Sequence, residues 1–229
     1  MKKILATLAL LLTFGLSFSG VAAQDGVEAP DVDGMEMDVE GAEYAYGRTY
    51  SVDFEALMST PDVDMASLDT SAMMRSISIQ GVQFDSEDNA NKYIEDSKAS
   101  IDEAMNGDEA LEGMEDLTVT ELEGFDKDGL LVTMGMPDLE AGMVMIVFVD
   151  GDQVYQITAI DGTVEDAQTK AEEVTQYVID AEIENEEVTF SEDGTSTGGV
   201  FDRMPAAGDE IVGDLTGVMD MEVLAPGAE

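Results

Sequence analysis

The sequence contains no cysteine, no histidine and no tryptophan. Without cysteine the chain can form no disulfide, no thiolate nucleophile, no iron–sulfur cluster and no cysteine zinc site. Without histidine it lacks the commonest general base, the commonest transition-metal ligand and the side chain that titrates near neutral pH. Ser-His-Asp and Cys-His catalysis are therefore impossible within this chain.

Positive charge is also scarce. Nine Lys and Arg stand against 52 Asp and Glu in 229 residues, which gives a formal net charge of −43. Phosphate backbones and anionic lipid surfaces attract basic proteins, so we expect no nucleic-acid partner and no attraction to anionic membranes. High acid content with little lysine is typical of surfaces adapted to salt, where screening shortens the repulsion between carboxylates. The alternative is a surface that collects inorganic cations or binds a polycation.

The N-terminus has the three regions of a secretory signal. Lys2 and Lys3 precede an apolar stretch from Ile4 to Phe18, and Val21-Ala22-Ala23 offers a cleavage site before Gln24. This order predicts a signal peptide over residues 1–23 and an exported protein, periplasmic or extracellular, with no stable membrane insertion after cleavage. The alternative is an N-terminal membrane anchor, for which the run is short because a span needs ~20 apolar residues.

Composition divides the rest of the chain into three parts. Residues 24–43 form an acidic segment with no helical or strand period, and residues 191–229 are rich in Gly, Ala and acid, so both are predicted to be flexible. Residues 44–190 are predicted to form one α+β domain. Its expected strands are Tyr44–Phe54, Ile77–Phe84, Leu117–Leu122, Leu130–Met136, Met143–Val149 and Gln153–Ile160, with a further short one at Val188–Phe190.

Two segments have the apolar spacing of amphipathic helices. One begins after a cap at Asp85-Ser86 and ends at Asn106-Gly107, and the other begins at Thr163, with Asp166 in the capping-box position. Turn sequences at 126–129 and 150–152 join neighbouring strands, which favours antiparallel pairing. The sequence therefore predicts an α+β fold with a mainly antiparallel sheet of about five to six strands, covered by two amphipathic helices and flanked by acidic flexible tails.

This order of elements resembles the antiparallel α/β/α sandwich of the PsbP-type family of exported proteins. The resemblance covers residues 45–190 and is carried by the Met143–Ile160 hairpin and the Thr163–Asp180 helix, within VYQITAIDGTVEDAQTKAEEVTQYVID. It implies a non-enzymatic accessory role. No motif of that family is identifiable in the chain, so the resemblance assigns no site residue.

Three acidic loops are candidates for calcium. Asp31-Val32-Asp33-Gly34 with Asp38 and Glu40 resembles an acidic calcium loop, but Met35 stands where an EF-hand needs a ligand. Asp126-Lys127-Asp128-Gly129 has no later acid at the right offset, and Asp150-Gly151-Asp152 is a tight hairpin sequence. Hard cations need 6–8 arranged oxygens, so none of these loops is assigned as a metal site.

Methionine is abundant, with 16 residues. Four pairs are spaced i, i+2, which on a strand places both side chains on one face. Thioethers bind Cu(I), so the pairs are candidate soft-metal ligands, although Met also packs well in the core of a sheet and no His or Cys strengthens such a site. The pairs are Met35/Met37, Met134/Met136, Met143/Met145 and Met219/Met221.

Few catalytic groups remain. Carboxylate pairs are possible anywhere in so acidic a chain, while Ser86 and the Ser97-Lys98 pair fall on a helix with a solvated face. Tyr44, Tyr46 and Tyr50 can line a groove for carbohydrate or peptide, or pack on the sheet, which is the commoner arrangement.

Taken together, these observations predict an exported, non-enzymatic binding or accessory protein with an acidic, salt-tolerant surface. We expect its partner to be an envelope or extracellular protein or a small ligand, with inorganic cations as a further possibility, and we assign no cofactor, catalytic residue or metal ligand. Two alternatives stay open: a cation-dependent hydrolase that uses carboxylates, and a calcium- or metal-binding protein.

Overall fold

The computed structural model describes residues 39–53, 73–106, 117–181, 189–190, 196–197 and 199–224. The predicted signal peptide over 1–23, the acidic loop from Asp31 to Asp38 and the Met35/Met37 pair lie outside these residues. Among the described helices, none has the length and apolar character that a membrane span requires.

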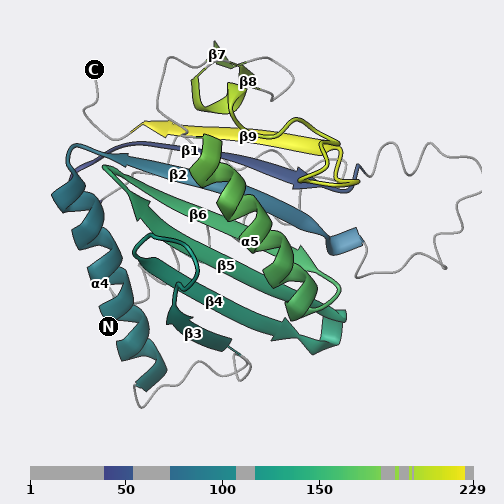
Figure 1. Cartoon of the computed structure of the whole chain (residues 1–229), viewed down its shortest axis with the longest axis horizontal. Coiled ribbons are helices and arrows are strands. Elements are labelled where there is room, and N and C mark those ends of the chain that lie inside the picture. The colour runs from purple at the N-terminus through teal and green to yellow at the C-terminus, as the bar shows by residue number, and fades with distance from the viewer. Residues whose placement is uncertain are drawn as a thin grey trace, which may run out of the picture.

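The main sheet has seven strands in the order β3-β4-β5-β6-β2-β1-β9 (Figure 1). Every neighbouring pair is antiparallel, so the predicted α+β class with an antiparallel sheet is confirmed. The strands are β1 Ala42–Ser51, β2 Ser76–Phe84, β3 Leu117–Glu121, β4 Gly129–Met136, β5 Ala141–Asp150, β6 Gln153–Asp161 and β9 Gly217–Leu224.

The two long helices of the described part begin where their caps predict. Helix α4 (Glu87–Asn106) follows β2, and the Ser86 hydroxyl accepts a hydrogen bond from the Asn89 backbone N–H at 3.4 Å. Helix α5 (Val164–Ala181) follows β6, and the Thr163 hydroxyl accepts from the Asp166 backbone N–H at 3.0 Å. These bonds satisfy backbone donors that have no partner in the first turn of a helix.

The helices cover opposite faces of the sheet. On the α5 face, alternate residues of β5 and β6 form the largest apolar cluster with the buried side of α5. On the α4 face, the other residues of β5 pack with those of β3 and β4 and with Ala90, Ile94 and Ile101 of α4. Because both faces are covered, β5 is buried at nine of its ten positions, in agreement with its continuous apolar sequence.

Gly142 of β5 lies against the beginning of α5. A Cβ atom at this position would overlap the backbone nitrogen of Val164, and backbone cannot move aside as a flexible side chain does. We therefore expect Gly142→Ala to lower the free energy of unfolding by about 1–3 kcal/mol, measured by urea denaturation. Gly162→Ala is the matched control, because its Cβ would meet nothing within 4 Å. Equal losses in the two variants would show that α5 does not depend on this close approach.

The strand count and the C-terminal boundary differ from the prediction. The sheet has seven strands rather than five to six, because β9 comes from the segment 191–229 that was predicted to be a tail. β9 pairs with β1 over its whole length, from Tyr44 opposite Leu224 to Ser51 opposite Gly217. The predicted strand at Val188–Phe190 is reduced to β7 (Thr189–Phe190), which pairs with β8 (Ser196–Thr197) in a separate ribbon.

The segment before β9 also belongs to the fold. It includes the short helix η4 (Gly199–Asp202), and Phe201, Met204, Val212 and Leu215 are buried in the α5-face core. The domain therefore extends beyond the predicted boundary at residue 190. The sequence of this segment is rich in Gly and acid, and its four buried apolar residues are irregularly spaced. No helix or strand period was therefore visible there.

Candidate functional site

An uncharged polar patch occupies part of the α4 face. It consists of side chains from three neighbouring strands, β6, β2 and β1, and each of them is only 4–8% exposed. We call it the polar patch: Thr49, Ser76, Ser78, Gln80, Gln156 and Thr158. Buried positions of a sheet are usually apolar, so six adjoining buried polar side chains require a reason.

Strand register assembles the patch from distant parts of the sequence. Ser78 of β2 lies between its cross-strand partners Thr49 of β1 and Thr158 of β6. In the next row Gln80 is opposite Gln156 on one side and Gly47 on the other. A Cβ at Gly47 would lie 3.0 Å from Cγ of Gln80, so the absence of a side chain there leaves room for the glutamine.

Hydrogen bonds connect the patch internally. The side-chain oxygens of Thr49 and Ser78 are 3.1 Å apart, and Gln80 Nε2 donates to the Ser78 hydroxyl at 3.2 Å. Gln156 Nε2 donates to the Thr158 hydroxyl at 3.5 Å. Buried hydroxyls and amides need such partners because each unmade bond costs about 1–3 kcal/mol.

The chemistry of the patch suits binding. Hydroxyl and amide groups both donate and accept hydrogen bonds, so they can match any neutral polar group. A hydroxyl becomes a nucleophile only beside a base, and the patch itself contains neither a base nor an acid. Its apolar neighbours are Met145 and Val147 of β5 and Ile160 of β6, so apolar side chains adjoin a few polar groups as in many ligand sites.

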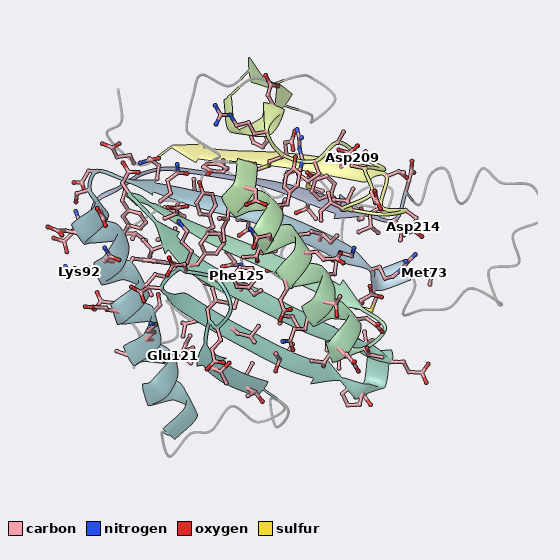
Figure 2. All side chains as sticks on the ribbon, viewed as in Figure 1. Met73, Lys92, Glu121, Phe125, Asp209 and Asp214 are labelled. Atoms are coloured by element: carbon pink, nitrogen blue, oxygen red, sulfur yellow. The ribbon has the colours of Figure 1, made fainter. Side chains whose placement is uncertain are left out.

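Helix α4 covers a different part of the same face. Its apolar residues pack with Leu117 of β3, with Leu130 and Val132 of β4 and with the ends of β2 and β6 at Phe84 and Val154. Charged groups lie at the periphery of the described structure: Lys92 on α4 and Asp214 before β9 point away from the sheet (Figure 2).

The α5 face holds a buried ion pair. Arg48 Nε and Nη2 donate to the two carboxylate oxygens of Asp220 at 2.6 and 2.8 Å, and Nη1 donates to the Phe201 carbonyl at 3.1 Å. The guanidinium also lies 5.2 Å from the centre of the Phe201 ring. The side chains of Arg48 and Asp220 are 10% and 0% exposed. We call this group, with Tyr50, the Arg48 cluster.

The Arg48 cluster holds the fold together. Burial works against the charge of Arg48, but the hydrogen bond and the charge of Asp220 raise its pKa above the ordinary value. For Tyr50, by contrast, burial raises the pKa, and the hydroxyl donates to the Pro205 carbonyl at 2.6 Å. Neutral Tyr50 and charged Arg48 thus join β1 to the segment from Phe201 to Asp220.

The predicted acidic loops do not form a described metal site. The loop containing Asp126 and Asp128 lies beside the β5–β6 turn, since the Val149 backbone N–H donates to the Asp128 carbonyl at 3.0 Å. Between these loops Lys127 Nζ pairs with Asp150 at 2.6 Å, so one of the loop carboxylates already has a cationic partner. Glu40 pairs with Lys92 at 2.5 Å. Within the described residues, no group of three or more potential acidic ligands could hold a metal.

The other candidates have structural positions. Ser86 caps α4, and Ser97 is buried on that helix beside the partly exposed Lys98. Tyr46 and Tyr50 are 1% and 0% exposed, so the prediction that they pack on the sheet is confirmed for these two. The Tyr46 hydroxyl donates to Gln153 Oε1 at 2.6 Å. The side chain of Tyr44 lies outside the described part.

The structure brings two of the methionine pairs together. Met134 of β4 and Met143 of β5 are cross-strand partners, so Met134/Met136 and Met143/Met145 share the α4 face. Met219 of β9 is opposite Thr49 and borders the polar patch on the same face. The partner of Met219 in the sequence pair, Met221, has no described side chain.

Sequence reasoning missed both the Arg48 cluster and the polar patch. A signal for the first exists, since the chain has three arginines, and one of them interrupts a Tyr-rich strand. An arginine in a strand of an acidic protein indicates a buried carboxylate partner. The patch gave no such signal because Ile77-Ser78-Ile79-Gln80 reads as a strand with one solvated face.

Comparison with known proteins gives little further information. No protein-family model matches the sequence, and no curated protein matches it. Among solved structures, the extracellular domain of PknH from Mycobacterium tuberculosis is similar at 13% identity with a TM-score of 0.31. The match covers 46% of this chain and 57% of the PknH domain chain, so this chain spans little more than half of it.

Proposed function

We propose that the protein is an exported, non-enzymatic binding or accessory module whose acidic surface keeps it soluble in salt and whose polar patch recognises a neutral segment of a partner protein. The polar patch carries this proposal, and because its side chains are only 4–8% exposed, a bound segment must displace the groups that bury them in the structure. It offers hydroxyl and amide groups in three cross-strand rows, and extended peptide groups also alternate donors and acceptors. An accessory role of this kind agrees with the PsbP-type resemblance.

The character of the ligand follows from what surrounds the patch. No charge lies among its six residues, so a charged ligand would be desolvated there without compensation. The adjoining Met145, Val147 and Ile160 are buried, so a segment that displaces the groups covering the patch would meet apolar side chains beside the polar ones. The described residues of this face contribute no exposed aromatic ring for stacking on a sugar. A neutral peptide with alternating polar and apolar residues fits best.

Nuclear magnetic resonance tests the proposal directly. A panel of short uncharged peptides, in which Asn, Gln, Ser or Thr alternate with Val or Leu, is titrated into the protein. At least one peptide is expected to shift the side-chain amide signals of Gln80 and Gln156, and to leave that of Gln176 on α5 unchanged.

Matched variants identify the groups responsible. Gln156→Leu should weaken binding of that peptide by about tenfold or more, because a polar group of the ligand loses its partner. Gln176→Leu is the control, since Gln176 Nε2 is exposed and bonds Asp180 at 2.9 Å. Loss of binding in both variants, or shifts confined to residues outside the α4 face, would refute recognition by the polar patch.

A further inference from the structure

Four methionines lie around one small cluster at one end of the α4 face. Met143 is buried in a small cluster with Ala141 and Ile160, and Met74, Met134 and Met136 pack against it. Met134 is directly opposite Met143, and Met136 follows on the same face of β4. Met73, the neighbour of Met74, lies just before β2, at the end of the sheet where the β4–β5 hairpin turns (Figure 2). We call Met74, Met134, Met136 and Met143 the methionine cluster.

The distribution of side chains on these strands argues against packing alone. β-branched residues suit strands best, and β5 uses them on the α5 face, where Val144 and Ile146 are fully buried. On the opposite face the same stretch carries Met143 and Met145 instead. Further along the same face β5 returns to Val147 and Val149, so methionine replaces β-branched residues only toward the end of the sheet that carries the methionine cluster.

The positions allow the sulfur atoms to converge. Directly opposed residues in an antiparallel pair have Cβ atoms roughly 4.5–5.5 Å apart, and diagonal ones lie roughly 7–8 Å apart. A methionine side chain has three rotatable bonds beyond its backbone, so thioethers from these positions can reach a common point. Met74 packs against the same cluster from just before β2, which lies on the other side of β6 from β5.

We propose that the methionine cluster is a binding site for Cu(I), held by thioether sulfurs. Soft thioether ligands select Cu(I) over hard cations, and without Cys or His the chain has no stronger soft ligand. The site is neutral, so a monovalent ion enters with little desolvation of protein charge. The site adjoins the polar patch at Ile160 but includes none of its six residues, and its occupation does not depend on the proposed peptide ligand.

An ion can reach this end of the sheet from solvent. Met74, Met134 and Met136 are each only partly buried. The short helix η3 (Pro137–Leu139), which joins β4 to β5 beside them, has no buried residue, and Leu139 is 39% exposed. The net charge of −43 also raises the local concentration of cations at low ionic strength.

Silver(I) is the probe that tests the site, because it has the ligand preference of Cu(I) and does not change oxidation state during the experiment. The protein is labelled with ¹³C at the methionine methyl groups and titrated with Ag(I) in a chloride-free buffer, since chloride also binds both ions. We expect the methyl signals of Met134, Met136 and Met143 to shift together and saturate at one equivalent. Cu(I) under anaerobic conditions, in competition with a chromophoric chelator, should give the same stoichiometry.

Variants separate this site from other binding. Leucine conserves the apolar volume of methionine, so the double variant Met134→Leu, Met143→Leu should stay folded, as its thermal unfolding will show. It is expected to bind Ag(I) at least ~100-fold more weakly, because even changes outside the ligand set of a metal site cost 10–100-fold. Met204→Leu, on the α5 face, is the control and should bind as the wild type does.

Three results would overturn the proposal. These are unchanged affinity in the double variant, equal losses in the double variant and Met204→Leu, and methyl shifts confined to methionines outside the cluster. None of these results bears on the polar patch. Conversely, failure of every peptide to bind would leave the Cu(I) result standing.

Discussion

Asp220→Ala is expected to lower the free energy of unfolding by about 3–5 kcal/mol, because it leaves the guanidinium of Arg48 buried without its counter-ion. Both carboxylate oxygens of Asp220 accept hydrogen bonds from Arg48, and the carboxylate has no exposed surface. Water therefore cannot replace the carboxylate oxygens as partners of Arg48 unless the contact between β1 and β9 opens. Urea denaturation followed by circular dichroism measures the loss.

Two further variants make this prediction specific. Asp214→Ala removes the partner of Arg75, where the side chains are 31% and 65% exposed, and should cost only about 0.2–1 kcal/mol. The double variant Arg48→Met, Asp220→Leu removes both charges and should recover most of the stability lost in Asp220→Ala. If the double variant is as unstable as Asp220→Ala, the loss comes from packing and not from the unpaired charge.

A chain that ends at residue 198 is expected to lose cooperative folding. It lacks Phe201, Met204, Val212 and Leu215, which are at most 4% exposed in the α5-face core. Burial of a large apolar side chain stabilises by about 1.5–3 kcal/mol, so the four together supply about 6–12 kcal/mol. The whole stability of a domain is about 5–15 kcal/mol, and the truncated chain also lacks β9 and the partner of Arg48.

The matched control is a chain that ends at Leu224, which keeps every described element. It should unfold at the temperature of the full chain, whereas the shorter chain should show no cooperative transition in calorimetry. A cooperative transition in the chain that ends at residue 198 would mean that residues 44–190 fold alone, as the sequence predicted.

Local patterns were sufficient for much of the fold. The continuous apolar run of β5, the turns that flank it and the hydroxyl caps at Ser86 and Thr163 act over a few residues, and each element that they predict is present. Pro137 ends β4 as expected, because η3 begins at that residue.

The parts that were missed depend on distant partners. Met219-Asp220-Met221-Glu222 alternates apolar and acidic residues, which predicts an exposed segment, until Arg48 is placed 172 residues away to pair with Asp220. The polar patch was missed for the same reason. Ser78 alone looks solvated, and only the register with Thr49 and Thr158 shows that it is buried among hydroxyls. Prediction of the candidate sites therefore required the three-dimensional structure, whereas the helices and hairpins could be predicted from local sequence.

The pairing of β1 with β9 also sets the order in which the protein can fold. Strands β3 to β6 are joined by short connections, so they can assemble quickly from neighbouring sequence. β1 belongs to the first described segment and β9 to the last, so closing their contact restricts nearly the whole chain between them. Until residues 217–224 leave the ribosome, or the export channel if the protein is secreted, the backbone groups along one side of β1 have no strand to bind. The last strand made is thus the one that completes the sheet.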